Sequence, residues 1–392
     1  MKLGFSAQEE LFRAECADWL QAQMAGAFKD IKGITTLTEK AERRKEWEQH
    51  LGEHRWSCIG WPKAWGGRDA TLAEQVIFAE EYARAGVPGR VNHIGIELAG
   101  PTILTFGTDE QKARFLPGIA AGTTIFCQGF SEPNAGSDLG SVRTKGRLED
   151  GHWIVNGQKI WTSLAHISDW IFVVTRTGEG SQGPKGLTFL MMDMHQPGIE
   201  VRPIVQINGD AEFNETFFTD ARCPADSMIG GVGDGWKIAM GLLAFERGVS
   251  TLGQQMAFRN ELDGIIAAAK ANGQANNPLI RQRIAKAEIG LRLMRYGALR
   301  MLSNTDHSSI DGAALTYKIQ WATWRRGLGE LAMDVLGQAG EIAEGDAYEW
   351  GMLPNLFLFS RSDTIYGGTN QIQRNLIAER GLGMPREPRG TA

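Results

Sequence analysis

The sequence predicts an α+β protein built from a helical N-terminal region, a run of short strands and a C-terminal region of long helices. Three observations predict this order. Apolar residues recur at steps of three and four in the first third of the chain, short β-type runs crowd the middle, and the helical period then returns until the end. Because 392 residues exceed one ordinary core, we expect three domains, at residues 1–122, 123–230 and 231–392.

The N-terminal domain is predicted to be all-α. Ser6 and Glu9 have the spacing of a capping box at the start of a helix. Four apolar residues follow at helical steps: Phe12, Cys16, Trp19 and Leu20. A loop rich in Trp, Pro and Gly follows at 61–67, and helical patterns resume over 74–85 and 111–115.

The middle domain is predicted to be a small sheet protein. Asn156-Gly157 lies between the apolar pairs 153–154 and 160–161, which is typical of a two-residue β-hairpin turn. Further β-type runs follow at 170–174, 187–190, 199–201 and 216–218. Strands this closely spaced, with turn residues between them, predict a sandwich or a barrel.

A glycine-rich stretch at 230–235 separates the strands from the C-terminal domain, and we interpret it as a flexible domain joint. The helical period is strongest in four later segments: 236–257, 280–302, 313–336 and 370–380. Gly381 and Pro385 follow the last of them, as expected where a helix stops.

Composition and charge exclude several classes of protein. The net charge of -5 argues against a nucleic-acid partner, which requires clustered basic residues. No stretch approaches the roughly 18 unbroken apolar residues of a membrane span, and no apolar signal region follows Met1, so we expect no membrane association and a cytoplasmic location. Four widely spaced cysteines predict reduced thiols: Cys16, Cys58, Cys127 and Cys223.

Several cofactor and catalytic motifs are missing from the sequence. No Gly-x-Gly-x-x-Gly follows a strand, and there is no phosphate-binding Lys loop and no Gly-x-Ser-x-Gly elbow. Ser-His-Asp chemistry stays open, because its members need no fixed spacing. We interpret the seven histidines as containing no pair at helical metal spacing and therefore predict no metal site: they stand at 50, 54, 93, 152, 166, 195 and 307.

Three stretches resemble the acyl-CoA dehydrogenase family. Residues 130–138 (Phe-Ser-Glu-Pro-Asn-Ala-Gly-Ser-Asp) and 156–163 (Asn-Gly-Gln-Lys-Ile-Trp-Thr-Ser) resemble its flavin-binding barrel, and 366–374 (Tyr-Gly-Gly-Thr-Asn-Gln-Ile-Gln-Arg) resembles its final helix. The resemblance runs through nearly the whole chain, in order. It implies an N-terminal helical domain, a middle β-barrel and a C-terminal four-helix bundle, with FAD held between barrel and bundle.

The resemblance also implies site residues. On one side of the isoalloxazine ring it places Gln128, Phe130 and Ser131, and on the other Trp161 and Ser163. The hydroxyl at the Ser163 position is expected to hydrogen-bond flavin N5. Thr369 and Gln371 are expected at the phosphate and adenosine part of FAD, and the substrate is expected to contact Ser137, Arg247 and Tyr366.

The chain departs from the family at its usual catalytic position. Most members carry the catalytic glutamate between the Tyr and Gly of the tail motif, where this chain has Gly367. A branch of the family places the glutamate on a bundle helix directly before an arginine, and Glu246-Arg247 matches that placement. Most helix glutamates are merely solvated, but the missing acid at 367 favours Glu246 as the base.

The resemblance implies the reaction. Glu246 removes the α-proton of an acyl-CoA thioester, flavin N5 accepts the β-hydride, and the product is the trans-2-enoyl-CoA. The backbone N–H of Gly367 is expected to hold the thioester carbonyl. A bulky, branched or steroid side-chain acyl group is what the branch suggests.

A second departure concerns the oligomer. The family's Arg-x-x-Phe-Gly segment, which reaches FAD across a dimer interface, is absent from 270–278. A similar branch forms tetramers of two unlike chains, so we expect a heterotetramer with a related subunit, with a homotetramer as the alternative. Electrons are expected to pass to an electron-transfer flavoprotein or a similar acceptor. Two other functions stay open: an oxygen-using acyl-CoA oxidase or flavin monooxygenase, and a non-catalytic subunit of a heteromeric dehydrogenase.

Overall fold

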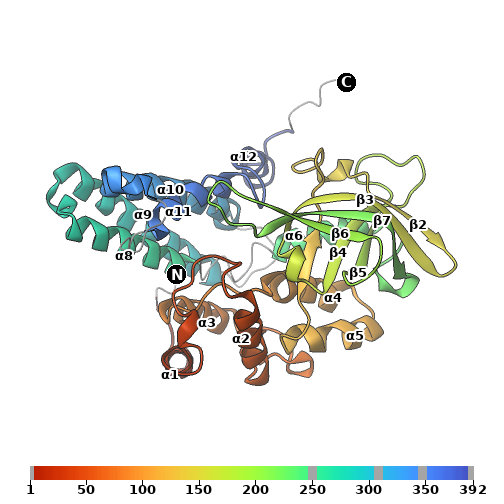
Figure 1. The fold of residues 1–392 in the computed structure, drawn as a ribbon, viewed down its shortest axis with the longest axis horizontal. Helices are drawn as coiled ribbons and strands as arrows, with labels where there is room; N and C mark the ends of the chain where they lie inside the picture. The colour runs from red at the N-terminus through yellow and green to blue at the C-terminus, as the bar shows by residue number, and fades with distance from the viewer. Residues whose placement is uncertain (1–3, 246–253, 304–311, 343–350, 387–392) are drawn as a thin grey trace. The chain divides into compact units, whose positions relative to one another are not determined.

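The computed structural model describes residues 4–245, 254–303, 312–342 and 351–386 (Figure 1). The chain forms two compact units, which we name by their content. The bundle unit contains Met1–Gln21, Leu72–Ala85 and Val249–Ala392, and the sheet unit contains Ala22–Thr71 and Gly86–Gly248. The domain boundaries expected at residues 122 and 230 stay a prediction.

The sheet unit contains, among the described residues, one eight-stranded sheet. Its strands follow the order β6-β7-β3-β2-β4-β5-β8, and β1 pairs with β4. Their bounds are β1 Phe126–Gly129, β2 Lys145–Glu149, β3 His152–Ser163, β4 Trp170–Arg176, β5 Leu187–Asp193, β6 Ile199–Ile204, β7 Phe213–Pro224 and β8 Met228–Ile229. β1 is parallel to β4, whereas β3 pairs antiparallel with both β2 and β7.

The sheet is buried on both faces, because neighbouring residues of one strand point to opposite sides. Phe172 of β4 and Phe189 of β5 enter a core that they share with helices of the same unit. Val173 and Leu190, the next residues of the same strands, enter a second core with residues of β3 and β7. This second core lies inside a curled sheet, as expected for a barrel.

Helices cover the outer face of β4 and β5 through the first of these cores. The sheet unit's α-helices are α2 Ala41–Glu53, α4 Gly100–Phe106, α5 Asp109–Ala120 and α6 Gly235–Phe245. α5 begins with a capping box, in which Gln111 N donates to Thr108 Oγ1 and Thr108 N donates to Gln111 Oε1. α6 begins at Gly235, where a Cβ would lie 2.6 Å from the backbone of Leu187.

The glycine-rich stretch before α6 forms a hydrogen-bonded turn. Gly230 and Gly233 have φ of 68° and 91°, which favours glycine. Gly231 N donates to Asp234 Oδ2 at 2.9 Å. Gly233 N also donates to Thr188 Oγ1 of β5 at 3.1 Å, so the turn is bonded to the sheet. The interpretation of this stretch as a flexible domain joint stays a prediction.

The predicted hairpin at Asn156-Gly157 is also wrong. Both residues lie inside the continuous strand β3, at a register shift between β3 and β7. The hairpin that does form joins β2 to β3 through Asp150 and Gly151, whose φ values are 47° and 73°. An Asp-Gly pair is a strong turn signal in its own right, and the sequence interpretation overlooked it.

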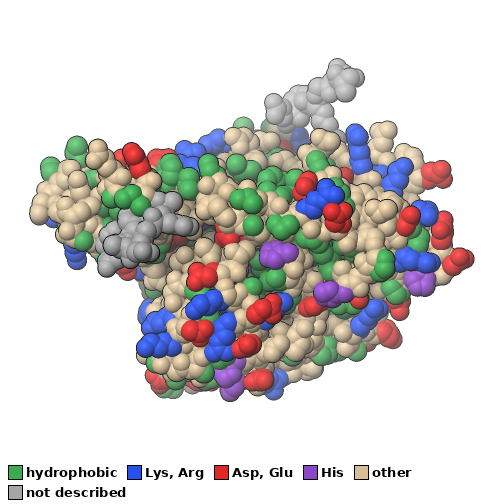
Figure 2. Space-filling model, in the orientation of Figure 1, with side chains coloured by type: hydrophobic (Ala, Val, Ile, Leu, Met, Phe, Trp, Pro, Cys, Tyr) green, Lys and Arg blue, Asp and Glu red, His purple; other side chains and the backbone are tan. Residues whose placement is uncertain are grey.

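Helix α2 corrects the interpretation of the histidines. His50 lies in the last turn of this helix and His54, four residues later, is its C-cap residue; residues four apart at a helix can lie on one face. The statement that no histidine pair has helical metal spacing is therefore wrong. Figure 2 shows acidic and basic side chains interspersed on the face that it displays, without a continuous basic stripe.

The bundle unit is built from long helices. They are α3 Leu72–Arg84, α8 Gln255–Ala271, α9 Pro278–Ser303, α10 Gly312–Leu336, α11 Met352–Phe359 and α12 Asn370–Leu376; α1, Ala7–Ala25, has its first part in this unit. Its core joins apolar residues of α8, α9, α10 and α11. The predicted helices 280–302 and 313–336 are confirmed by α9 and α10.

A buried acid ties α3 to three other helices of the bundle unit. Glu80 is fully buried and pairs with Arg13 of α1 at 2.9 Å and with Arg295 of α9. Gln255 of α8 donates to the same carboxylate at 3.2 Å. The buried charge is therefore compensated by two cations and an amide.

Other sequence predictions have mixed outcomes. The capping box of Ser6 and Glu9 is confirmed. The predicted helix 236–257 is found only at its two ends, because residues 246–253 lie outside the described residues. In the described part of the chain, all four cysteines are buried and none forms a disulfide, and no helix has the length and hydropathy that crossing a bilayer requires.

Candidate active site

The sheet unit brings together the two segments that were expected to flank a flavin ring. Ile160 N donates to Ser131 O at 2.9 Å, so the end of β1 lies beside the second half of β3. Gln128 and Ser131 are half-buried. The ring of Phe130 packs edge-to-face on Phe172 in the core, with centroids 5.7 Å apart. The ring of Phe130 is therefore part of the core rather than of an open ligand surface.

A buried ion pair holds this segment in place. Lys159 is fully buried, and its Nζ donates to Glu132 Oε1 at 2.9 Å and to Phe130 O at 3.0 Å. The backbone N–H groups of Arg143 and Thr144 donate to the same carboxylate. Burial lowers the pKa of Lys159 to about 8, although Glu132 opposes this shift. Burial alone would raise the pKa of Glu132, but Lys159 and the two N–H groups hold it below its usual value.

Trp161 occupies a strained position near the end of β3. Its φ is 61°, a left-handed conformation that costs a non-glycine residue about 1–3 kcal/mol. Its side chain is 55% exposed and meets Phe213 edge-to-face. The strain is held by Asn214, whose Nδ2 donates to Thr162 O at 3.0 Å and to Glu212 O at 3.1 Å. The β3–β7 register shifts here, between Lys159 and Thr162, and presents the indole outward.

Ser163 lies two residues after the exposed indole and pairs with Phe213 of β7. It is half-buried, so its hydroxyl sits at the edge of the same exposed patch. The placement of Trp161 and Ser163 beside a flavin ring stays a prediction.

The bundle unit holds the tail motif with a second buried acid. Asp363 is fully buried and accepts from Arg325 Nη1 at 3.1–3.2 Å and from Tyr366 OH at 2.8 Å. Glu261 forms a bidentate pair with the same arginine. Both acids raise the pKa of Arg325, although burial opposes them, so the guanidinium stays charged. Arg325 of α10 therefore anchors the segment that directly precedes the tail motif.

The backbone conformation of Gly367 leaves its N–H available as a hydrogen-bond donor. Its φ is 60° and that of Gly368 is 89°, conformations in which a side chain is strained. Gln373, itself buried, donates to Gly367 O at 3.3 Å. Among the described residues no acceptor contacts the Gly367 N–H. The carbonyl is thus anchored while the N–H is available to a ligand oxygen.

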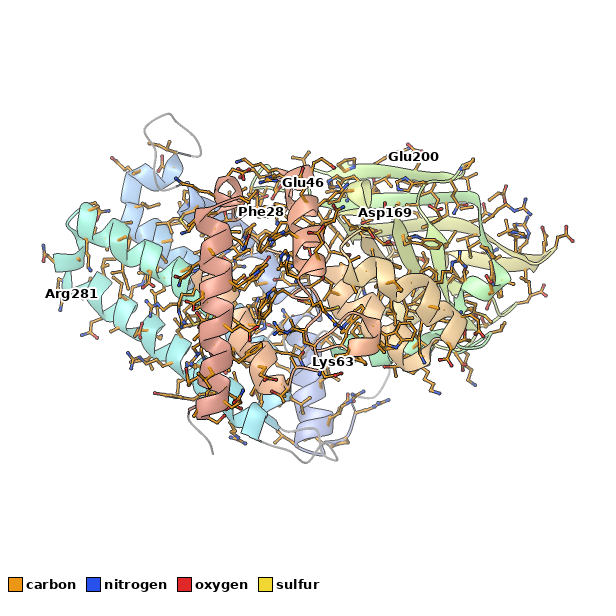
Figure 3. The ribbon with its side chains drawn as sticks, turned by 90° about the horizontal axis from the view of Figure 1, so that it is seen from below. Phe28, Glu46, Lys63, Asp169, Glu200 and Arg281 are labelled. Carbon is orange, nitrogen blue, oxygen red and sulfur yellow. The ribbon has the colours of Figure 1, made fainter. Side chains whose placement is uncertain are left out.

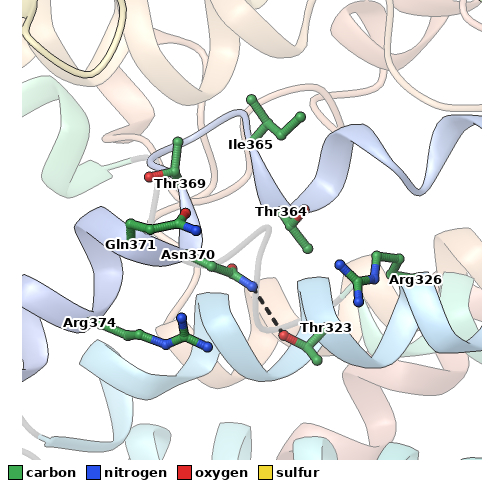
Figure 4. A pocket seen from close by; sticks show the side chains of 8 residues that line it. All are labelled: Thr323, Arg326, Thr364, Ile365, Thr369, Asn370, Gln371 and Arg374. Atoms are coloured by element: carbon green, nitrogen blue, oxygen red, sulfur yellow. Dashed lines mark hydrogen bonds between the residues drawn. The ribbon is translucent and has the colours of Figure 1, made fainter.

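The start of α12 lines a hollow of about 360 Å³ (Figure 4). Its walls carry Thr323, Arg326, Thr364, Ile365, Thr369, Asn370, Gln371 and Arg374. Thr369 caps the helix by accepting from Ile372 N at 3.2 Å. Asn370 donates to Thr323 through Nδ2, and its buried Oδ1 has no partner among the described residues.

The donor set of this hollow fits a phosphate-bearing cofactor. Two guanidinium groups, Arg326 and Arg374, line the hollow, and the helix N-terminus adds N–H groups; both kinds of group bind phosphate. The orphaned Asn370 Oδ1 can accept a hydrogen bond from a ligand hydroxyl or amine. Thr369 and Gln371 both line it; their role at the phosphate and adenosine part of FAD, which the family resemblance implies, stays a prediction.

Of the four remaining predicted site residues, the structure describes Ser137 and Tyr366. Ser137 is exposed in the loop after β1. Tyr366 is 39% exposed, so its ring can contact a substrate while its hydroxyl stays bonded to Asp363. Glu246 and Arg247 lie outside the described residues.

Sequence reasoning missed the residues that support the site. Lys159 lies within a stretch that carries the family resemblance, but its partner Glu132 is 27 residues away. The Arg325–Asp363 pair spans 38 residues, and Asn214 acts on β3 from another strand. A lysine directly before the apolar pair 160–161 was the one signal available, because lysine is rarely buried without a partner.

Comparison with family models matches three consecutive parts of the chain. The N-terminal domain of acyl-CoA dehydrogenases matches residues 6–123, the middle domain residues 127–221 and the C-terminal domain residues 233–382. The matches follow one another in order and together span most of the chain. The α+β architecture expected from the sequence, helical, then sheet-rich, then helical, is thereby confirmed.

Curated relatives and solved structures agree. The acyl-CoA dehydrogenase IpdE1 of Mycobacterium tuberculosis is 50% identical over 385 residues, which cover 97% of this chain and 99% of that protein. IpdE1 of Mycolicibacterium smegmatis is 49% identical, covering 97% and 98%. The structure of the Tcur3481-Tcur3483 steroid ACAD has a TM-score of 0.88 at 28% identity, covering 99% of this chain and all of that chain.

The ChsE4-ChsE5 complex from Mycobacterium tuberculosis is a further structural neighbour, with a TM-score of 0.84 at 27% identity, covering 99% of this chain and all of that chain. Family models, relatives and structures therefore point the same way, as do the barrel segments and the tail motif. The chain belongs to the acyl-CoA dehydrogenase family, FAD-dependent oxidoreductases that act on CH–CH bonds of acyl-CoA thioesters.

Proposed function

We propose that this chain is the base-bearing subunit of a heteromeric dehydrogenase that acts on a bulky, steroid-derived acyl-CoA. Glu246 is the base that removes the α-proton. The observation that carries the proposal is the shape of Gly367: the position that usually holds the family's acid has become a backbone donor with φ of 60°. A carboxylate must then come from elsewhere, and Glu246-Arg247 has the placement of the alternative base.

The α C–H of a thioester is a weak acid, so its removal requires a base and a stabilised carbonyl oxygen. The Gly367 N–H is oriented by the Gln373 bond to its own carbonyl. It donates to the thioester oxygen as negative charge develops there. Tyr366, Arg247 and Ser137 contact the substrate beside it.

FAD, when bound, supplies the hydride acceptor. Within this chain, Gln128, Ser131, Trp161 and Ser163 would hold the isoalloxazine ring, with Phe130 contributing its backbone. Thr369 and Gln371 would hold the phosphate and adenosine part. Electrons then leave to an electron-transfer flavoprotein or a similar acceptor.

A second chain is proposed because this one lacks a phosphate ligand of the family pattern. The connection from α8 to α9 consists of a short 3-10 turn, Gln274–Asn276. No Arg or Phe occurs between residues 270 and 278. Two structural neighbours bear names of two-component assemblies, Tcur3481-Tcur3483 and ChsE4-ChsE5, which supports a heterotetramer with a related subunit.

The substrate class follows from the same neighbours. The Tcur3481-Tcur3483 protein is titled a steroid ACAD. Glycine at 367 also removes side-chain volume next to the thioester, as a bulky acyl group requires. We therefore propose a steroid-derived acyl-CoA for this chain.

Anaerobic titration with CoA thioesters tests the base. The complete, FAD-loaded complex should bleach its flavin absorbance with a steroid-derived acyl-CoA, while Glu246→Gln should retain FAD and lose reduction by at least about a thousandfold, because the α-proton then has no acceptor. Glu341→Gln, at an exposed acid, is the matched control and should reduce normally. If the flavin of Glu246→Gln is reduced at the wild-type rate, Glu246 is not the base.

A further inference from the structure

We propose that His50, Glu53 and His54 form a binding site for a divalent transition-metal ion on the last turn of α2. One potential ligand atom from each of these residues lies within 4.8 Å of the other two. The site belongs to the sheet unit and does not depend on the proposed catalytic residues.

The helix itself brings the three side chains together. His50 and Glu53 lie in the last turn of α2, three residues apart, and His54 is its C-cap residue; residues three and four apart at a helix are neighbours on one face. The two imidazole rings have their centroids 4.3 Å apart. Glu53 Oε2 lies 3.8 Å from His50 Nδ1. Three ligand groups thus converge without any loop rearrangement.

A neighbouring amide fixes the orientation of His50. Its Nε2 lies 3.0 Å from Gln23 Oε1. An amide oxygen only accepts hydrogen bonds, so the proton of His50 resides on Nε2 and the lone pair on Nδ1, the atom that faces Glu53. Histidine ligands of metals are commonly held in this way by an acceptor on the other ring nitrogen.

A hydrogen bond through one ring nitrogen also orients His54. Its Nδ1 lies 2.9 Å from the carbonyl oxygen of His50, which accepts the proton of that nitrogen. The lone pair is therefore on Nε2. Both imidazoles are hydrogen-bonded through one nitrogen in the tautomer that offers the other to a cation.

The surroundings combine one fixed ligand with two adjustable ones. The His50 ring packs on Phe28 and Trp47, with centroid distances of 5.0 and 5.9 Å; Figure 3 shows Phe28 beside the helix that carries Glu46. Glu53 and His54 are exposed. Their side chains can rotate to close the gap to the roughly 2.0–2.2 Å that zinc requires.

The donor set selects the class of metal. Two imidazole nitrogens and one carboxylate oxygen suit Zn²⁺, Ni²⁺ or Cu²⁺, whereas Mg²⁺ and Ca²⁺ prefer all-oxygen sites. Three protein ligands leave a further position for water. Because His50 is bonded to Gln23, a bound ion also ties α2 to the segment before Phe28. Binding should therefore raise the melting temperature of the folded protein.

Calorimetric titration of ZnCl₂ into the chelator-treated, FAD-loaded complex tests the proposal. We expect one Zn²⁺ per chain. Gln23→Ala should weaken binding roughly ten- to a hundredfold, the usual loss when a hydrogen bond to a ligand is removed. His54→Ala and Glu53→Gln change exposed residues and should weaken it by at least as much, with turnover unchanged.

His195→Ala is the matched control. His195 is another exposed histidine, and its Nε2 lies 3.2 Å from Asp169 Oδ1. It lies outside the His50, Glu53 and His54 cluster, so the variant should bind Zn²⁺ as the wild type does. Zn²⁺ should also raise the melting temperature of wild type and His195→Ala but not of His54→Ala. Binding that is absent from the wild type, or unchanged in His54→Ala, overturns the proposal.

Discussion

Lys159→Met should destabilise the sheet unit by about 3–5 kcal/mol, the range measured when one partner of a buried ion pair is removed. The structure gives the reason. Lys159 Nζ contacts Glu132 at 2.9 Å with both side chains out of water, and methionine leaves that carboxylate uncompensated. The two backbone N–H groups of Arg143 and Thr144 stay on the carboxylate, which places the expected cost at the lower end.

The melting temperature measures this cost. A loss of 1 kcal/mol lowers the melting temperature of a unit of this size by roughly 2–4 °C, so Lys159→Met should melt roughly 6–12 °C lower. Lys145→Met is the matched control, because Lys145 is exposed in the neighbouring strand β2. It should change the stability by no more than about 0.5 kcal/mol.

A double variant separates charge from shape. Glu132→Gln alone leaves the ammonium of Lys159 uncompensated and should also destabilise. Combining it with Lys159→Met removes both charges, and much of the loss should be recovered. The non-additivity of the two changes measures the pair itself.

The same variants should report on the cofactor site. Lys159 also donates to Phe130 O, so its loss frees the backbone that precedes Ser131. We expect faster FAD release from Lys159→Met than from Lys145→Met at a temperature where both are folded. Equal melting temperatures and equal FAD release in these two variants would refute the reasoning.

Two further predictions concern Glu212, directly before β7, and Asn214, at the start of that strand. Burial, together with the nearby Asp210, raises the pKa of Glu212 to about 7 despite Arg44, so the stability that protonated Glu212 contributes is complete below about pH 4.5 and is lost as the pH rises through about 7. Glu212→Gln should flatten the dependence of the unfolding free energy on pH, measured by chemical denaturation, and stabilise the protein at pH 8 by about 2–3 kcal/mol. An unchanged pH dependence would contradict this prediction. Asn214→Ala removes the amide that donates to both Thr162 O and Glu212 O. It should lower the free energy of unfolding by about 1–3 kcal/mol and quicken FAD release. Unchanged FAD release would show that the left-handed backbone of Trp161 does not depend on Asn214.

Local patterns predicted much of this fold. The Ser6–Glu9 capping box, the long helices α9 and α10 and the strand-rich middle were all predicted from residue type and spacing, since each depends on neighbours within a few positions. The motif stretches around 130–138, 156–163 and 366–374 predicted the family, because their order is specific even without coordinates.

Where local signals competed, the sequence misled. Asn156-Gly157 is a good turn pair, yet tertiary pairing with β7 keeps it inside a strand, and Asp150-Gly151 makes the turn instead. The left-handed backbone of Trp161 has no local signal either. It depends on Asn214, which reaches β3 from the neighbouring strand.

What the sequence by itself determined is the chemistry: which side chains and which glycines the chain carries, and in which order. What only the tertiary structure decided is their support, because Lys159 with Glu132, and Arg325 with Asp363, are partners only once distant segments fold together. A buried charge is stable only beside its counter-charge, and no spacing along the chain says where that counter-charge lies.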